Sequence, residues 1–111
     1  MAMSSLRHDT CAPLPPGTRP LDRKQAMELA TEAGGWTLAP DGLSISNKFQ
    51  QPGFAQALAF FNDVGRIAIS QKHFPEISLQ ENTVEIILTT PEISGLSRND
   101  FVLAAKISAL A

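Results

Sequence analysis

The sequence has few residues that could cross-link the chain, anchor it in a membrane or bind a metal. Cys11 is its only cysteine, so an intrachain disulfide is excluded. No apolar run approaches the ~20 residues that span a bilayer, and the first residues lack the apolar core of a signal peptide. With two histidines and one cysteine, nitrogen and sulfur ligands are too few for a typical metal site. We therefore predict a cytoplasmic protein that spans no membrane and holds neither metal nor cofactor.

Basic residues are also too few to attract nucleic acid. The chain has 9 Lys and Arg against 11 Asp and Glu, which gives a net charge of -2 at pH 7. A protein that neutralises backbone phosphates needs a basic excess, so we predict no direct nucleic-acid binding. The hydrophobic fraction of 43% is normal for a globular protein, and 111 residues suit one domain.

Residues 1–20 differ in composition from the rest of the chain. They contain four prolines and almost no apolar periodicity. Segments of this kind bury too little apolar surface to offset the entropy lost on ordering. The composition predicts a disordered tail over residues 1–20 and a folded domain over residues 21–111. The alternative is that the tail becomes ordered on a partner.

Three segments have helical periodicity. Asp22 and Gln25 form a capping box before the first helix, which a Gly-Gly pair ends, and Ser97 and Asp100 form a second box before the last helix. The middle helix, over residues 53–71, has two neighbouring apolar stripes. The first stripe consists of Phe54, Ala57, Leu58, Phe61 and Ala68, and the second of Phe60, Val64 and Ile67.

Four segments alternate between apolar and polar residues, as strands do. Residues 36–40 and 43–49 flank a Pro-Asp-Gly turn, and residues 77–80 and 84–89 flank an Asn-containing turn. Two hairpins that each bury one face indicate an α+β fold with a four-stranded antiparallel sheet. The order α-β-β-α-β-β-α places three helices on one face of that sheet.

Three motifs fall at the ends of these elements. His73-Phe74-Pro75-Glu76 follows the middle helix, Leu88-Thr89-Thr90-Pro91 ends the fourth strand, and Gly95-Leu96-Ser97-Arg98-Asn99-Asp100 opens the last helix. This spacing resembles the pterin-4a-carbinolamine dehydratase family. The resemblance implies that family's fold, with an active site where these motifs meet.

Most of the catalytic set that the resemblance implies is replaced. The family has His-His-Pro-Glu at the first motif, so its first histidine is His73 and its second is Phe74. Its third histidine is Pro91, and the acid four residues before the first histidine is Ile69, whereas Asp100 is retained. Carbinolamine dehydration needs an acid and a base, and imidazole serves as both near neutral pH. We therefore predict that the chain has no catalytic residues and is not an enzyme.

The two retained residues also have plain structural explanations. A capping box alone accounts for an acid at Asp100. His73 follows a helix C-terminus, where a cation is favoured. The sequence leaves open whether either residue keeps a role in binding.

The same resemblance suggests a function without catalysis. Replacing imidazoles by apolar residues makes the old site more like an interface. One degenerate branch of the family acts as a Rubisco assembly factor in bacteria with α-carboxysomes, and the chain resembles it. This interpretation predicts a chaperone that binds the Rubisco large subunit and is carboxysome-associated. The candidate contact residues are His73, Phe74, Pro75, Glu76 and Pro91.

Two other functions stay open. One is a 4a-hydroxytetrahydrobiopterin dehydratase with a reduced site of His73 and Asp100. The other is a transcriptional cofactor, which the absence of a basic excess would direct to a protein partner. The resemblance further implies a homodimer or a dimer of dimers built by pairing sheet edges, since exposed edge strands need cover.

Overall fold

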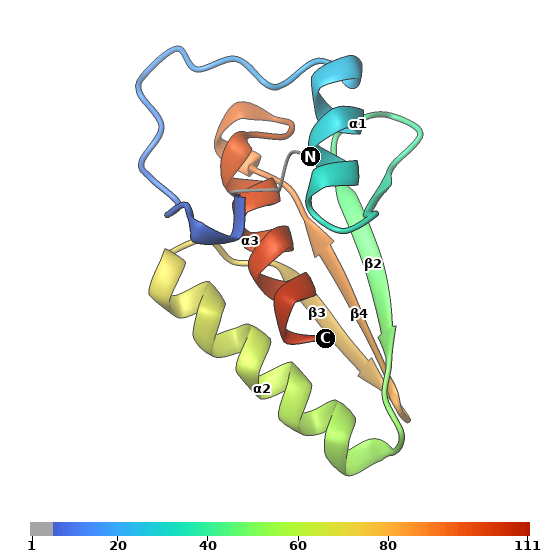
Figure 1. Ribbon diagram of the computed structural model, residues 1–111. Helices are drawn as coiled ribbons and strands as arrows, with labels where there is room; N and C mark the ends of the chain where they lie inside the picture. Colours follow the sequence, from blue (N-terminus) through green and yellow to red (C-terminus); the bar gives the residue numbers. More distant parts are fainter. Residues whose placement is uncertain (1–5) are drawn as a thin grey trace.

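The computed structural model describes residues 6–111, and Figure 1 shows its helices gathered on one face of a single sheet. The three helices are α1 (Arg23–Glu32), α2 (Phe54–Gln71) and α3 (Arg98–Leu110). The four strands are β1 (Thr37–Leu38), β2 (Ile45–Gln50), β3 (Glu76–Gln80) and β4 (Thr83–Leu88). Two short 3-10 turns are η1 (Leu6–His8) and η2 (Pro91–Ile93). The predicted α+β class and element order are confirmed.

The sheet is antiparallel throughout, with strand order β1-β2-β4-β3. β4 is therefore an inner strand, and its inward residues Val84, Ile86 and Leu88 are fully buried. The β3–β4 turn contains Glu81 at φ 55°. The first strand is shorter than predicted, because only two of its residues pair with β2.

The core lies between the sheet and α3, which α1 and α2 flank. α3 is buried along most of its length, from Asp100 to Ala105 and again at Ile107. At its far end the Trp36 Nε1–H donates to Ser108 Oγ at 2.9 Å. Gly34, at φ +114°, lies against the same serine, and a Cβ there would come within 2.6 Å of the hydroxyl. The approach of α1 to α3 therefore requires glycine at this position.

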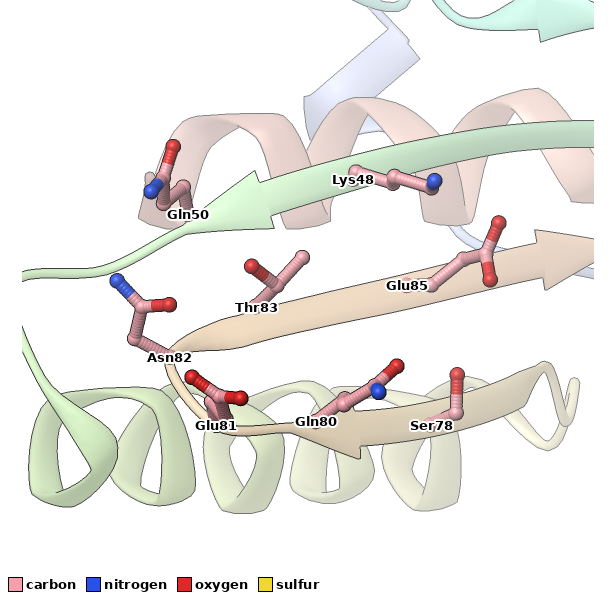
Figure 2. A pocket seen from close by; sticks show the side chains of 8 residues that line it. All are labelled: Lys48, Gln50, Ser78, Gln80, Glu81, Asn82, Thr83 and Glu85. Atoms are coloured by element: carbon pink, nitrogen blue, oxygen red, sulfur yellow. The ribbon is translucent and has the colours of Figure 1, made fainter.

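The opposite face of the sheet is polar and open (Figure 2). Side chains from β2, β3, β4 and the β3–β4 turn lie there around a shallow hollow of about 530 Å³. They are Lys48, Gln50, Ser78, Gln80, Glu81, Asn82, Thr83 and Glu85. The hollow contains no buried polar group that would select a ligand, and we interpret it as a solvated sheet face.

Which side of α2 faces the core differs from the prediction. The buried residues are Ala57, Phe60, Val64 and Ala68, which combine members of both predicted stripes. Phe54 and Leu58 were expected in the core, yet they are 58% and 42% exposed. The two stripes overlap on the helix surface, so the sequence pattern alone did not decide which line would face the sheet.

The predicted disordered tail is also wrong over part of its length. Leu6 is 1% exposed and belongs to the hydrophobic core, and η1 packs against α3 (Figure 1). Residues 1–5 of the predicted tail lie outside the described residues. The contacts that place residues 6–14 come from residues about 60 to 100 positions later, so local composition contained no trace of them.

Candidate functional site

The C-terminal end of α2 decides where His73 points. Lys72 caps the helix in the left-handed conformation at φ 57°, and His73 N donates back to Ala68 O at 3.3 Å. Pro75 disfavours helical geometry at the residue before it, so the chain extends from Phe74 into β3. Two residues that are neighbours in the sequence therefore point in opposite directions: His73 is buried, at 8% exposed, and Phe74 faces solvent, at 70% exposed.

Asp100 is the centre of a buried polar network. Its Oδ1 lies 2.5 Å from His73 Nε2, and its Oδ2 accepts from Thr90 Oγ1 at 2.6 Å and from Ser97 N at 3.0 Å. The Thr90 and Ser97 hydroxyls are 2.8 Å apart. The capping box predicted for Ser97 and Asp100 is present, so one carboxylate both starts α3 and holds the imidazole.

The network fixes which imidazole nitrogen remains free. An ionised carboxylate only accepts hydrogen bonds, so His73 Nε2 carries the hydrogen toward Asp100. Nδ1 has no partner among the described residues. His73 therefore offers one nitrogen for binding or proton exchange, and its ring orientation is held by Asp100.

A cavity of about 270 Å³ adjoins this histidine. His73 and Thr90 lie on one side together with residues from the end of α2 and the start of α3. Residues 11–14 of the N-terminal segment form the other wall. The cavity thus has a polar side that belongs to the domain and a cover that belongs to the N-terminal segment.

Cys11 lies in that cover. Its Sγ donates to Asn99 O at 3.4 Å, and its backbone N donates to Gln71 Oε1 at 2.8 Å. Burial raises the pKa of the Cys11 thiol to about 11, although the nearby Lys106 opposes the shift. The thiol is therefore protonated at neutral pH and unreactive as a nucleophile.

The structure unites only two of the residues that the sequence singled out, namely His73 and Asp100. Pro75 is half-buried, whereas the other candidates are exposed and none of them lines the cavity. These exposed residues are Ile69, Phe74, Glu76 and Pro91.

Four polar residues at the site were not among the predicted site residues, although Ser97 was predicted as a helix cap. Thr90 and Ser97 complete the Asp100 network, and Gln71 and Asn99 contact the N-terminal segment. Thr90, Ser97 and Asn99 stood inside the motifs of the resemblance, which was the available signal. Gln71 had none, because its partner is 60 residues away along the chain.

Residues 6–111 lack the features of two further classes of site. This part of the chain contains no group of three His, Cys, Asp or Glu side chains placed to hold a metal ion. None of its helices combines the length and the apolar character needed to cross a bilayer.

The fold and the site motifs define a family. The family model described as pterin 4 alpha carbinolamine dehydratase matches residues 19–110, and the chain belongs to this family. A protein of Cupriavidus pinatubonensis named "Putative pterin-4-alpha-carbinolamine dehydratase 1" is 46% identical over 96% of this chain and 91% of its own. A protein of Halorhodospira halophila named "Putative pterin-4-alpha-carbinolamine dehydratase" is 39% identical over 96% of this chain and 97% of its own.

Solved structures show the same fold. A transcriptional coactivator/pterin dehydratase from Brucella melitensis superposes with a TM-score of 0.78 at 25% identity, over 84% of this chain and 99% of that one. A pterin dehydratase-like protein identified as a RuBisCO assembly factor in the α-carboxysome superposes with a TM-score of 0.60. Its identity is 21%, over 68% of this chain and 88% of that one, so the likeness is one of fold alone.

Proposed function

We propose that this protein is a non-catalytic protein-binding module on a pterin dehydratase scaffold. The observation that carries the proposal is an exposed apolar face on α2. Phe54, Leu58 and Ile69 follow at intervals of 4 and 11 residues, which places them on one side of the helix. They are 58%, 42% and 68% exposed, and the 70% exposed Phe74 follows the same helix.

Single exposed apolar residues are common on protein surfaces, but several on one side of the same helix favour an interface. Four of the seven large hydrophobic residues that are exposed in the described chain lie on or just after α2. Two of these four, Ile69 and Phe74, occupy positions where the resemblance places an acid and a histidine. The same substitutions that remove proton-transfer groups therefore add apolar surface.

The partner that we propose is the Rubisco large subunit, bound during assembly of an α-carboxysomal enzyme. This choice of partner is supported by the family resemblance and by the fold shared with a RuBisCO assembly factor. An assembly factor must release its client, so its interface is expected to be modest in area and partly polar. Phe74 and the neighbouring Glu76 supply one apolar and one charged contact of this kind.

Co-expression of Rubisco subunits with and without this protein tests the proposal. We expect more soluble, active holoenzyme in its presence and capture of the large subunit on a tagged chain. The tagged chain is not expected to remain in the finished holoenzyme. Equal Rubisco yields in the two cultures, with no capture of the large subunit, would reject this partner.

A residual dehydratase is the second candidate, and one observation favours it. His73 and Asp100 are still paired at 2.5 Å beside a cavity. Yet dehydration needs an acid and a base, and the pair leaves one free imidazole nitrogen. Losing a single acid or base group typically costs about 10²–10⁴ in rate.

A stopped-flow assay with 4a-hydroxytetrahydrobiopterin distinguishes the two candidates. We expect no useful acceleration, and kcat/KM near about 10⁴ M⁻¹s⁻¹, the low end for ordinary enzymes, would establish the dehydratase instead. The double change Phe74→His with Pro91→His is expected to restore at most a small part of the rate. Both side chains are exposed and lie outside the cavity that contains His73.

A further inference from the structure

Residues 6–14 run along α3 in a groove that extends from Lys106 in its second half to Asn99 at its start, where residues 11–14 also reach the end of α2. The Asn99 side chain pairs with the Ala12 backbone in both directions, since Ala12 N donates to Oδ1 at 3.1 Å and Nδ2 donates to Ala12 O at 2.8 Å. Gln71 Oε1 accepts from Cys11 N at 2.8 Å. These hydrogen bonds are made to backbone atoms of Cys11 and Ala12 and do not depend on the side chains there. Another extended chain could therefore form the same hydrogen bonds.

The rest of the segment supplies side-chain anchors. Leu6 is inserted into the core beside α3, where Figure 1 shows η1 in dark blue. Three residues later, Asp9 forms an ion pair with Arg98 at 2.6 Å. Lys106 Nζ donates to the Arg7 carbonyl at 2.8 Å. The groove therefore offers an apolar pocket for Leu6, two cationic side chains, and the side-chain amides of Gln71 and Asn99, which pair with the segment's backbone.

We propose that this groove binds a peptide segment of a partner protein, with a turn at its apolar anchor and an extended part beyond it, and that residues 6–14 occupy the groove as an internal competitor. The inference rests on the proposed function, because a protein-binding module needs a surface for its partner. The groove selects an apolar anchor residue, an acidic residue three positions later, and a free backbone N–H and C=O beyond it. Side-chain amides of this kind pair with an extended chain as a neighbouring strand would.

The contacts beyond Leu6 are weak enough for the segment to be displaced. Both members of the Asp9–Arg98 pair are solvent-exposed, with side chains 39% and 55% exposed, and surface pairs contribute little. Hydrogen bonds formed in exchange for water also give small net gains, while ordering the segment costs backbone entropy. Leu6 is fully buried, so an external peptide must supply an apolar anchor of its own to compete with the closed state. Its apparent affinity is reduced by the fraction of closed molecules.

Two variants break the same contact from opposite sides. Ala12→Pro removes the segment's N–H and leaves the groove intact, whereas Asn99→Ala removes the groove's side chain. Ala12 is exposed, so the change to proline leaves the core unaltered. Asn62→Ala, at an exposed asparagine of α2, is the matched control.

The first measurement is the rate at which iodoacetamide labels Cys11, the only thiol in the chain. Cys11 is partly buried and its thiol is hydrogen-bonded to Asn99 O, so labelling is expected to be faster when the segment leaves the groove. We expect Ala12→Pro, which removes one hydrogen bond, to react about fivefold faster than the original chain, the factor that one net hydrogen bond is worth. Asn99→Ala removes both hydrogen bonds to Ala12 and is expected to react at least as fast as Ala12→Pro. The Asn62→Ala control is expected to react at the original rate. Equal rates for all four proteins would show that the segment is not displaced and would overturn the proposal.

The second measurement is fluorescence anisotropy with a labelled peptide of the sequence of residues 6–14. The Ala12→Pro protein is expected to bind it about fivefold more tightly than the original chain, because its groove is intact and more often open. The Asn99→Ala protein is expected to bind it less tightly than the Ala12→Pro protein, although its own segment is released at least as often. Equal binding by the two variants, or no binding by either, would contradict a peptide site in this groove.

The Rubisco co-expression experiment is independent of these two measurements. Faster labelling and tighter peptide binding by Ala12→Pro, with no effect of the protein on Rubisco yield, would keep the groove and reject the Rubisco partner. Enhanced Rubisco yield with unchanged labelling and no peptide binding would keep the proposed function and reject the groove.

Discussion

Asp100 is a single residue on which three structural features depend. It is 0% exposed, and its two oxygens accept from His73, from Thr90 and from the Ser97 backbone. Each of these groups is buried, so each loses a charged acceptor if the carboxylate is removed. A buried donor without its partner costs more than the bond contributed when it was made.

We expect Asp100→Asn to lower the free energy of unfolding by about 1.5–3 kcal/mol, the range for hydrogen bonds to a charged group. The amide keeps the shape of the carboxylate but replaces one acceptor oxygen with a donor. Urea unfolding at pH 7 measures the change. Asp63→Asn is the control, because Asp63 forms an exposed pair with Arg66 and is expected to cost less than about 1 kcal/mol. Similar losses for both variants would contradict the role assigned to Asp100.

The Cys11 thiol predicts how the N-terminal segment responds to pH. Burial raises its pKa from 9.0 to about 11 in the folded chain. A raised pKa means that the closed segment binds the proton more tightly than the open one, so closure is fully stabilised below pH 9.0. That stabilisation is lost as the pH rises toward about 11.

The rate of Cys11 alkylation as a function of pH checks this expectation, since only the thiolate reacts. In the native chain the rate is expected to rise through a midpoint near 11. In urea the midpoint is expected to fall toward 9.0, the ordinary value of the thiol. Identical profiles in the two conditions would show that Cys11 is not buried in solution.

At the scale of elements, the end of α2 contains a conformation that its sequence does not favour. Lys72 caps the helix at φ 57°, where a side chain costs roughly 1 kcal/mol and glycine costs little. The turn is nevertheless required, because it directs His73 inward and the next residue outward.

We therefore expect Lys72→Gly to raise the free energy of unfolding by about 0.5–1 kcal/mol, since glycine adopts this conformation without strain. Lys72→Ala is the matched control, because alanine removes the same side chain and keeps the strain. Thermal and urea unfolding of both variants measure the difference. Equal stability of the glycine and alanine variants would exclude a strained cap.

At the scale of the whole molecule, the distribution of exposed apolar residues is uneven. The helices cover one face of the sheet, and the other face is polar (Figure 2). Three of the seven large apolar side chains that are exposed in the described chain, Phe54, Leu58 and Ile69, lie on one side of α2 instead, and Phe74 follows that helix. This arrangement predicts that binding and folding can be separated by mutation.

We expect the double change Ile69→Ser with Phe74→Ser to reduce capture of the Rubisco large subunit at least about tenfold while stability changes by less than about 1 kcal/mol. Both residues are about 70% exposed, so they contribute little to folding, whereas buried apolar anchors dominate binding. Met27→Ser with Leu110→Ser is the control, since these residues are exposed elsewhere. Light scattering of each variant shows whether the same face instead joins two copies of the chain. Equal capture by the two double variants would place the partner on another surface.

Features that depend on neighbouring residues could be predicted from the sequence. The capping boxes at Asp22 and Ser97, the Gly-Gly stop and the alternation of the strands involve residues a few positions apart, and the structure contains them. One exception is Leu43, which was expected on the buried face of the second strand but is exposed and precedes β2. The element order then followed from the number and periodicity of segments. His73 and Asp100 were named from motif spacing, although only the closed fold brings them within 2.5 Å.

Contacts between distant parts of the chain were decided only by the tertiary structure. The sequence offered two apolar stripes on α2, and packing against the sheet selected a line between them. Composition predicted disorder for residues 6–14, yet Leu6 and Ala12 find partners on α3 that no local pattern could indicate. Local rules describe the conformation that each segment prefers. Which surfaces meet is decided by the burial of apolar area and the pairing of polar groups over the whole molecule.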